Sequence, residues 1–413
     1  MNTTEAPAKV QEKPISNPKK KRRWIKLRHR IVRVIAYLIL KPISRLKYGI
    51  KIEPLRDKRQ FTILLNHQTP FDQFFVGMAF PRVIYYVASE DIFSNGFVSS
   101  LIRFLVAPIP IKKQTTDLRA IRTILSVAKE GGSIAIAPEG NRTYSGRTEY
   151  MAPSISSLVR RMKLPVALFR IEGGYGVQPR WADGTRRGKM RAYVTRIIEP
   201  EEYEGLTDDE LFSVIREGLY VNEAVPSGIY KSKRSAEYLE RMLYVCPFCG
   251  FSRFESHGDT VICKTCGQDV RYLPTKELSA VESEFPFRFL AQWYDYQKDF
   301  VNGIDPMQYT ETPIFTDTAN IFEVIVYQKK KRLAKNVTVT LYGDRAVVGN
   351  MIVPFSEASA FTVLGRNKLN IYYEGRIYQL KGDKRFNALK YVHLYHRYKN
   401  LSKGDGNGKF LGL

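Results

Sequence analysis

The sequence has few cysteines, few acidic residues relative to basic ones, and no long apolar run, and each shortage excludes a class of protein. Its 413 residues include four cysteines, all between positions 246 and 266. A disulfide framework spread along the chain is therefore excluded, and a reducing compartment is expected. The apolar segment 31–40 follows a basic run, as in a secretory signal, but Arg33 interrupts it and no small-residue cleavage site follows. It is also about half as long as a membrane-spanning helix.

The shortage of acidic residues leaves a strongly basic chain. Lysine and arginine number 65 against 41 aspartates and glutamates, which gives a net charge of +24. Such an excess indicates a polyanionic partner, either an anionic membrane surface or nucleic acid, and the charge by itself does not choose between them. The length of the chain predicts two or three domains.

The N-terminal region contains a basic tail followed by an amphipathic pattern. Residues 1–23 are rich in Pro, Ala, Asn and charge, and we expect them to be disordered. Six apolar residues then recur at helical spacing with basic residues between them: Trp24, Leu27, Ile31, Val34, Ile35 and Leu38. Such a helix either lies on a membrane surface or packs on its own domain, and the pattern is compatible with both.

Between residues 50 and 200, short apolar runs alternate with helical stretches. Strands are predicted at 61–65, 83–88, 133–137 and 165–171, and a helix at 118–129. This alternation is typical of an α/β domain with a mostly parallel sheet. We assign residues 24–235 to this domain, including the N-terminal helix. Loops at the strand ends are where such folds place their chemistry.

The rest of the chain divides into further segments. A helix is predicted at 230–244 and a small cysteine-bearing unit at 244–272. Residues 315–400 show short strands separated by turns, then a helix with one apolar face formed by Phe386, Leu389, Val392 and Tyr395. This pattern predicts an antiparallel, barrel-like β domain closed by a helix, which resembles pleckstrin-homology-type barrels in pattern only. A flexible tail is expected at 401–413.

The strand at 61–65 leads into Asn66-His67-Gln-Thr-Pro-Phe-Asp72, which places a histidine five positions before an aspartate. On a continuous helix the two side chains would point about 140° apart. A helix that starts at Pro70, with Thr69 as its N-cap, leaves His67 in the preceding loop within reach of Asp72. In that arrangement His67 can act as a general base and Asp72 can fix its tautomer. Alternatively, Asp72 only completes a capping box.

Four blocks in order give the chain a resemblance to the glycerolipid acyltransferase family, which includes lysophosphatidate and glycerol-3-phosphate acyltransferases. The first is the His-x4-Asp motif just described, and the others are Pro108-Ile-Pro-Ile-Lys112-Lys113, Ala137-Pro-Glu139-Gly140-Asn141-Arg142 and Leu164-Pro-Val-Ala-Leu168. The resemblance covers residues 45–220. It implies direct acyl transfer to a hydroxyl through a ternary complex, without a redox cofactor. No Gly-x-Ser-x-Gly elbow is present, so an acyl-serine mechanism has no support.

The resemblance also assigns the site residues. It implies that His67 and Asp72 are catalytic and that the substrates are bound by Asn66, Lys112, Lys113, Glu139, Gly140 and Arg142. The guanidinium of Arg142 offers a planar fork suited to phosphate, although a solvated arginine in a surface turn is the alternative. The chain departs from the family pattern at three positions: Lys113 stands where the family has arginine, Asn141 where it has Thr or Ser, and Leu168 where it often has proline.

The cysteines form two Cys-x2-Cys pairs, each followed by glycine and separated from one another by 13 residues. The pairs are Cys246 with Cys249 and Cys263 with Cys266. Paired thiolates at this spacing resemble a zinc ribbon, and four thiolates fill a tetrahedral zinc, so we expect a structural zinc. Redox pairs or two disulfides are the alternative.

Taken together, these patterns predict an enzyme of phospholipid biosynthesis. We expect it to transfer a fatty acyl group from acyl-CoA or acyl-carrier protein to lysophosphatidate, with glycerol 3-phosphate or another lysolipid as the alternative acceptor. The basic N-terminal helix predicts a peripheral or monotopic protein at the cytoplasmic face of the cell membrane. The competing class is a basic zinc-ribbon protein that binds nucleic acid, or a lipid-binding scaffold. Because no nucleic-acid motif accompanies the ribbon, nucleic acid is not the expected partner.

Overall fold

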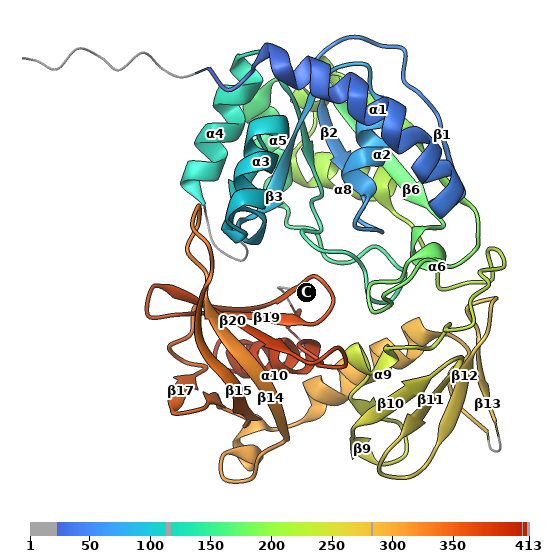
Figure 1. The fold of residues 1–413 in the computed structure, drawn as a ribbon, viewed down its shortest axis with the longest axis vertical. Coiled ribbons are helices and arrows are strands. Elements are labelled where there is room, and N and C mark those ends of the chain that lie inside the picture. Colours follow the sequence, from blue (N-terminus) through green and yellow to red (C-terminus); the bar gives the residue numbers. More distant parts are fainter. Residues whose placement is uncertain (1–22, 113–116, 282–283, 407, 411–413) are drawn as a thin grey trace, which may run out of the picture.

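The computed structural model describes residues 23–112, 117–281, 284–406 and 408–410. Within these ranges the chain forms an α/β unit, a small unit with the four cysteines, and a C-terminal antiparallel sheet with a helix (Figure 1). This arrangement confirms the predicted fold class. Lys113 and the predicted disordered tail, apart from Arg23, lie outside the described residues.

A seven-stranded sheet in the order β1-β7-β6-β2-β5-β3-β4 forms the centre of the α/β unit. Neighbouring strands run parallel except for β6 and β7, which pair antiparallel. The strands are β1 (Ile50–Ile52), β2 (Thr62–Leu65), β3 (Ile84–Ser89), β4 (Ile109–Ile111), β5 (Ser133–Ile136), β6 (Val166–Glu172) and β7 (Met190–Ile198). Because β2 is buried along its whole length in the middle of the sheet, the loop that follows it starts from the core.

Helices cover this sheet and fix the loops at its edge. They are α1 (Leu27–Tyr48), α2 (Asp72–Ala79), the 3-10 turn η1 (Glu90–Ser94), α3 (Phe97–Val106), α4 (Leu118–Lys129), α5 (Ser154–Met162), α6 (Gly174–Val177), α7 (Pro200–Glu204) and α8 (Asp208–Leu219). The helix α4 has the predicted bounds because Asp117 caps it, accepting hydrogen bonds from the backbone N–H groups of Arg119 and Ala120.

The long helix α1 lies across the outside of the α/β unit, beside α2 and α3 (Figure 1). Its start is held by Trp24, whose indole N–H donates to the carbonyl of Ala107 at 2.9 Å. The apolar stripe predicted from the sequence points outward: the exposed large apolar residues of α1 and α3 are Leu27, Ile31, Val34, Ile35, Leu38, Ile39, Ile43, Leu46, Phe97, Val98, Leu101, Phe104 and Val106. None of the helices in the described ranges is both long and apolar enough to cross a membrane.

The small cysteine-bearing unit consists of two antiparallel sheets. A two-stranded sheet pairs β8 (Val245–Cys246) with β9 (Gly250–Phe251), and a four-stranded sheet contains β10 (Phe254–His257), β11 (Thr260–Cys263), β12 (Asp269–Tyr272) and β13 (Leu278–Ala280). The helix α9 (Leu290–Gly303) packs beside them, and its Trp293 donates from the indole N–H to the carbonyl of Val245 at 2.8 Å.

The C-terminal sheet is antiparallel throughout, in the order β17-β16-β15-β14-β20-β19-β18, and curls into a half-barrel. Its strands are β14 (Phe315–Glu323), β15 (Lys331–Leu341), β16 (Arg345–Val348), β17 (Met351–Pro354), β18 (Ala360–Leu364), β19 (Lys368–Tyr373) and β20 (Arg376–Gly382), and α10 (Leu389–Leu401) packs on the sheet. The core of this half-barrel is continuous with that of the cysteine-bearing unit.

One local prediction was wrong, and the predicted flexible tail 401–413 stays a prediction. The segment 230–244 contains a single 3-10 turn, Leu239–Arg241, instead of a helix, because its backbone bonds to other parts of the chain: the N–H of Tyr230 donates to Pro274 and that of Lys231 to Arg187. In the tail predicted to be flexible, Phe410 is buried, and its ring stacks on His393 with 4.6 Å between centroids.

The C-terminal sheet docks on the α/β unit through η1. The backbone N–H groups of Tyr327 and Lys330 donate to the carbonyls of Phe93 and Ser94. The hydroxyl of Tyr372 donates to the buried carboxyl of Glu90 at 2.7 Å. These contacts hold β18 to β20 against the lower edge of the α/β unit as it is drawn in Figure 1.

Candidate active site

The loop after β2 brings together the histidine and aspartate singled out in the sequence. Nδ1 of His67 lies 2.7 Å from Oδ2 of Asp72, and the two side chains are 27% and 1% exposed. A carboxylate on Nδ1 stabilises the tautomer with the proton on Nδ1, which leaves Nε2 as the atom that can accept a proton. The imidazole is therefore oriented and reachable from solvent.

The start of α2 differs from the prediction in detail. The helix begins at Asp72 instead of Pro70. Thr69 nevertheless caps this turn as predicted, because its hydroxyl oxygen accepts from the N–H of Phe71 at 3.1 Å and its own N–H donates to the Asp72 carboxylate. That carboxylate also accepts hydrogen bonds from the N–H of Gln68 and from the Thr69 hydroxyl, in addition to its contact with His67. Four donors compensate for burial of the negative charge and keep the carboxylate in place for the imidazole.

Asn66 holds the strand that precedes the histidine. Its amide donates from Nδ2 to the carbonyl of Ile171 at 2.8 Å and accepts from the N–H of the same residue at 2.7 Å. The side chain is fully buried. In this structure Asn66 joins β2 to the end of β6, so its contacts are those of a positioning residue, and its predicted contact with substrate stays a prediction.

Glu139 also acts on the backbone of the histidine loop. Oε1 accepts from the N–H of His67 at 3.1 Å and Oε2 accepts from the N–H of Glu149 at 2.8 Å. Burial raises the pKa of Glu139 to about 8, against the lowering effect of these two hydrogen bonds. The loop after β5 is thereby tied to the loop after β2.

Arg142 is the group in this site that lacks a counter-ion. The residue is only 8% exposed, and its Nη1 is buried without a hydrogen-bond partner among the described residues. Burial, followed by the positive charges of Arg180 and Arg366, lowers its pKa to about 9, so the guanidinium stays protonated at neutral pH. A buried charge without a partner is costly, and an anion would satisfy it.

Gly140 and Lys112, two further predicted binding residues, make fewer contacts in this site. Gly140 has a φ of +69°, a left-handed conformation that favours glycine, and a side chain there would meet open space. Lys112 is exposed, and its backbone N–H donates to the capping carboxylate of Asp117 at 3.1 Å. The predicted contact of Lys112 with phosphate stays a prediction.

Three residues around this site were not predicted from the sequence: Tyr48, Gln178 and Arg180. Tyr48, at the end of α1, donates to Gln178 at 3.0 Å, and burial together with the charge of Asp72 raises its pKa to about 12. Arg180 donates from Nη1 to the carbonyl of Arg142 at 2.9 Å. None of the three lies in a recognisable block, and the chain segments that carry them meet the site only in the folded protein.

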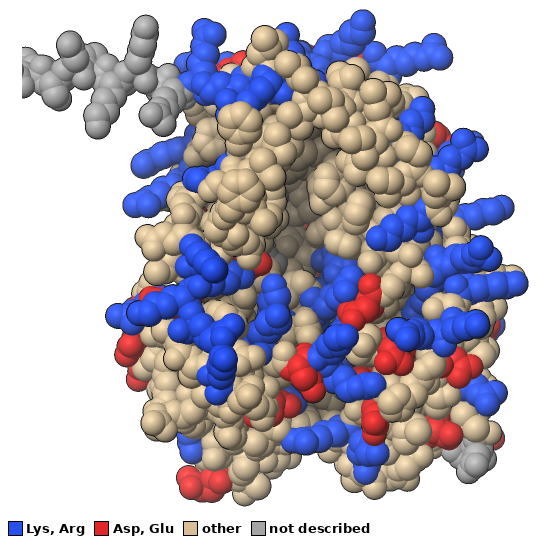
Figure 2. Space-filling model, in the orientation of Figure 1, with Lys and Arg blue, Asp and Glu red and all other residues tan. Residues whose placement is uncertain are grey.

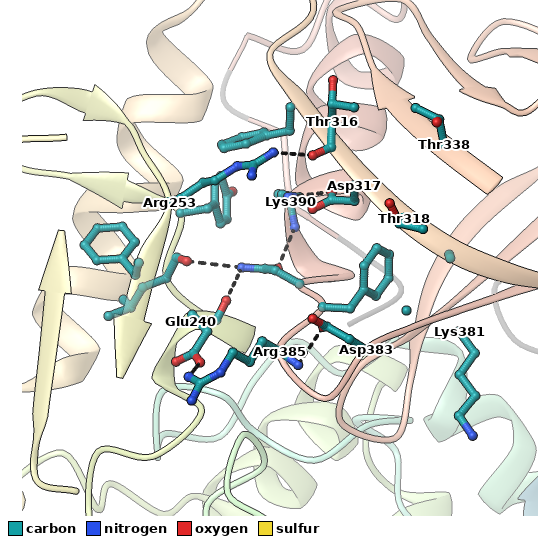
Figure 3. A pocket seen from close by; sticks show the side chains of 18 of the residues that line it. Glu240, Arg253, Thr316, Asp317, Thr318, Thr338, Lys381, Asp383, Arg385 and Lys390 are labelled. Carbon is teal, nitrogen blue, oxygen red and sulfur yellow. Dashed lines mark hydrogen bonds and ion pairs between the residues drawn. The ribbon is translucent and has the colours of Figure 1, made fainter. Parts of the chain in front are cut away.

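Figure 2 shows where this molecule is hollowed. A recess opens in the upper, α/β half, below a surface of uncharged side chains, and lysines and arginines gather beneath it. A second pocket lies between the cysteine-bearing unit and the C-terminal sheet (Figure 3), where charged groups are paired with one another. Lys390 lies 2.7 Å from Asp317, and Arg385 pairs with Glu240. Arg253, which also lines that pocket, donates to the carbonyl of Thr316.

The four cysteines form a single cluster. All four sulfur atoms lie within 4.8 Å of one another, with Cys246 to Cys266 at 3.6 Å and Cys249 to Cys263 at 3.5 Å. Zinc–sulfur bonds of about 2.3 Å in a tetrahedron require sulfurs about 3.8 Å apart. The cluster is thus able to hold a metal ion. It belongs to the small β unit, and its ligand atoms are not part of the His67 site.

Comparisons with known proteins place the similarity in the α/β unit. Residues 49–171 match the family model described as Acyltransferase. A 1-acyl-sn-glycerol-3-phosphate acyltransferase from Bacillus subtilis (strain 168) is 24% identical over 185 residues, which are 44% of this chain and 89% of that protein. The crystal structure of the 1-acyl-sn-glycerophosphate (LPA) acyltransferase PlsC from Thermotoga maritima superposes with a TM-score of 0.40 and 19% identity, over 46% of this chain and 77% of that chain.

Proposed function

We propose, from the match of residues 49–171 to the acyltransferase family model, that this chain acylates the free hydroxyl of 1-acyl-glycerol-3-phosphate, or lysophosphatidate. The donor is a fatty acyl thioester of coenzyme A or of acyl-carrier protein. The observation that carries the proposal is the His67–Asp72 pair, at 2.7 Å, in the same loop cluster as the uncompensated guanidinium of Arg142. The N–H of Thr143, which follows Arg142, donates to the carbonyl of His67.

The chemistry follows from the tautomer that Asp72 favours. Nε2 of His67 takes the proton of the acceptor hydroxyl while the hydroxyl oxygen attacks the thioester carbonyl carbon. The tetrahedral intermediate then expels the thiolate of the carrier, which receives the proton from His67, and the new oxygen ester is released. Asp72 stabilises the imidazolium that exists between the two proton transfers. Such a base contributes roughly 100- to 10,000-fold to the rate.

The acceptor is oriented by its phosphate. In this proposal the phosphate bonds to the guanidinium of Arg142, which has an unused buried donor at Nη1. Glu139 orients the histidine loop through its bond to the N–H of His67. The relative from Bacillus subtilis is named for an acceptor of this type.

The acyl acceptor resides in a membrane, and the outer face of α1 and α3 suits an anionic bilayer. Exposed apolar side chains such as Leu38 and Phe97, which are 67% and 80% exposed, form this face. Basic residues flank it, including Arg28, whose guanidinium lies over the ring of Phe104. Each basic residue near anionic lipid adds roughly 1 kcal/mol of attraction. The protein then sits as a peripheral or monotopic enzyme on the cytoplasmic face of the cell membrane.

The cysteine cluster completes the proposal as a structural zinc site. Cys246, Cys249, Cys263 and Cys266 would bind the ion, and four thiolates leave no position for a reactive water. The zinc would stabilise the small β unit, whose buried residues Cys246 and Cys263 belong to the core shared with the C-terminal sheet. It supplies no step of acyl transfer.

The test of the function is turnover by the purified chain with lysophosphatidate and acyl-CoA, then with acyl-carrier protein as donor. We expect His67→Ala to abolish product formation and His257→Ala, at an exposed histidine of β10, to leave it unchanged. Glycerol 3-phosphate and other lysolipids serve as alternative acceptors in the same assay. Equal turnover by wild type and His67→Ala would show that His67 is not the base.

The membrane surface is tested separately with vesicles of phosphatidylcholine and phosphatidylglycerol. Ile35→Asp combined with Leu38→Asp should reduce sedimentation with the vesicles. Ile352→Asp is the matched control, because Ile352 is also exposed but lies in the C-terminal sheet. Equal binding by both variants and the wild type would show that α1 is not the docking face.

A further inference from the structure

A turn of the C-terminal sheet reaches the phosphate-binding arginine of the α/β unit. The turn is Gly365-Arg366-Asn367, between β18 and β19, and it lies outside the residues that match the acyltransferase family. Gly365 has a φ of +63°, which favours glycine and sharpens the turn. The contact joins residues that are far apart in the sequence.

Arg180 forms this contact. Its Nε donates to the carbonyl of Gly365 at 3.0 Å, and its Nη1 donates to the carbonyl of Arg142 at 2.9 Å. The same guanidinium lies 4.2 Å from the centre of the Tyr144 ring. One guanidinium group therefore bridges the carbonyl oxygens of Gly365 and Arg142. Arg366 follows Gly365, so the turn that carries Arg366 is joined to the backbone of Arg142 through Arg180.

Positively charged side chains outnumber carboxylates at this junction. Arg366 donates from Nη1 to Asp183 at 2.8 Å, and the same carboxylate oxygen accepts from Arg241 at 2.7 Å. Arg180 bonds to backbone carbonyls, and Arg142 keeps a donor without a partner. A guanidinium has five N–H donors, so Arg366 retains donors beyond the one that Asp183 uses. The side chain is 31% exposed, which leaves it open to a ligand.

Arg366 is also close enough to act on the site electrostatically. Its positive charge contributes, after burial and Arg180, to the lowered pKa of Arg142. It also counteracts the rise in the pKa of Tyr48, whose main causes are burial and the charge of Asp72. Both effects are those of a positive charge in the neighbourhood of Arg142 and Tyr48.

We propose that Arg366 of the C-terminal sheet completes the acceptor site with Arg142 and makes the enzyme selective for acceptors that carry a phosphate monoester. This inference rests on the proposed function. A monoester phosphate carries between one and two negative charges at neutral pH, because its second pKa is about 6, and it has three terminal oxygens. A phosphodiester headgroup carries one charge and two such oxygens. Two guanidiniums from different sides match the monoester better than the diester.

The experiment compares steady-state kinetics of the full chain and its Arg366 variants on two acceptors. The monoester acceptor is lysophosphatidate, and the diester acceptor is lysophosphatidylglycerol. We expect Arg366→Gln to raise the KM for lysophosphatidate about tenfold, as for one lost charge-assisted hydrogen bond, with kcat and the KM for the donor within about twofold of wild type. The kcat/KM for the diester should stay within about twofold, and Arg366→Lys should recover part of the loss.

Arg376→Gln is the matched control. Arg376 is exposed in the same sheet, but it starts β20 and pairs with the far end of β19. The six residues of β19 separate it from the β18–β19 turn by about 20 Å. We expect this variant to match the wild type on both acceptors.

Three results would overturn the inference. One is an unchanged KM for lysophosphatidate in Arg366→Gln. Another is an equal loss on both acceptors accompanied by a lower thermal midpoint, which would mean that Arg366 only joins the two units. The third is a wild-type preference for the diester.

Failure of the proposed function itself would look different. It would appear as activity in His67→Ala or as no acyl transfer by the wild type. Calorimetric binding of glycerol 3-phosphate needs no turnover and so tests Arg366 in that case too. Weaker binding by Arg366→Gln than by Arg376→Gln is expected, and equal binding would overturn the inference.

Discussion

Nδ1 of His67 lies 2.7 Å from Oδ2 of Asp72, and that carboxylate is held by two backbone N–H groups and the Thr69 hydroxyl. The pair comes from one short segment between β2 and α2, so little of the rest of the chain is needed to form it. The remaining parts of the site, Glu139 and Arg142, come from the loop after β5 and are joined to it by backbone hydrogen bonds.

Asp72→Asn should lower kcat by about 100- to 10,000-fold with little change in the KM for either substrate, because the amide neither favours the required tautomer nor stabilises an imidazolium. Steady-state kinetics with saturating donor measure this effect. Asp208→Asn, at an exposed aspartate on α8, serves as the control and should keep full activity. A kcat within a few-fold of wild type in Asp72→Asn would mean that Asp72 only shapes the loop.

Arg142→Gln should make the unliganded protein more stable while it weakens acceptor binding. The wild-type guanidinium is buried without a counter-ion, so its replacement should raise the free energy of unfolding by about 1–3 kcal/mol. Urea unfolding and the KM for lysophosphatidate measure the two effects.

Arg180→Gln serves as a control for Arg142→Gln, because the opposite change in the free energy of unfolding is expected. Arg180 donates to the carbonyls of Arg142 and Gly365, so its loss should lower the free energy of unfolding. A loss of stability in Arg142→Gln would show that the guanidinium has a stabilising partner in the free protein.

Glu139 should make the stability depend on pH. Burial raises its pKa in the folded protein to about 8, against about 4.3 in an unfolded chain. Between these values the folded state binds more protons, so the contribution of this group to stability is lost as pH rises from about 4.3 to about 8. Urea unfolding at pH 5 to 8 should show a weaker decline with pH in Glu139→Gln than in the wild type. Glu204→Gln, at an exposed carboxyl, should decline as the wild type does.

The purified chain should contain one zinc ion, and Cys263→Ser should lose it. Because Cys263 and Cys246 are buried in the core shared with the C-terminal sheet, loss of the ion should lower the thermal midpoint of the protein. Elemental analysis and thermal unfolding measure both. Ser252→Ala, which removes a hydroxyl 3.0 Å from the Cys263 sulfur, should keep the metal. Full stability in a metal-free Cys263→Ser variant would contradict a structural role.

Local sequence was sufficient to predict an element where the residues that begin and end it lie next to it in the chain. The helix α4 has the predicted bounds because Asp117 caps its start and Gly131 and Gly132 follow its end. The strand β14 has a polar alternation from Phe315 to Asn320 and contains no apolar run there. Its identity as a strand comes from pairing with β15 and β20 on its two sides.

The sequence by itself determined the His67–Asp72 pair and the four-cysteine cluster. Their members are close along the chain, so a turn or a hairpin is enough to bring them together. Only the tertiary structure decided that Arg142 is buried without a counter-ion among the described residues and that the turn carrying Arg366 is linked to it. The link between them runs through Arg180 and Gly365, which are 185 positions apart. No local periodicity encodes such a contact, because it forms only when the C-terminal sheet docks on the α/β unit.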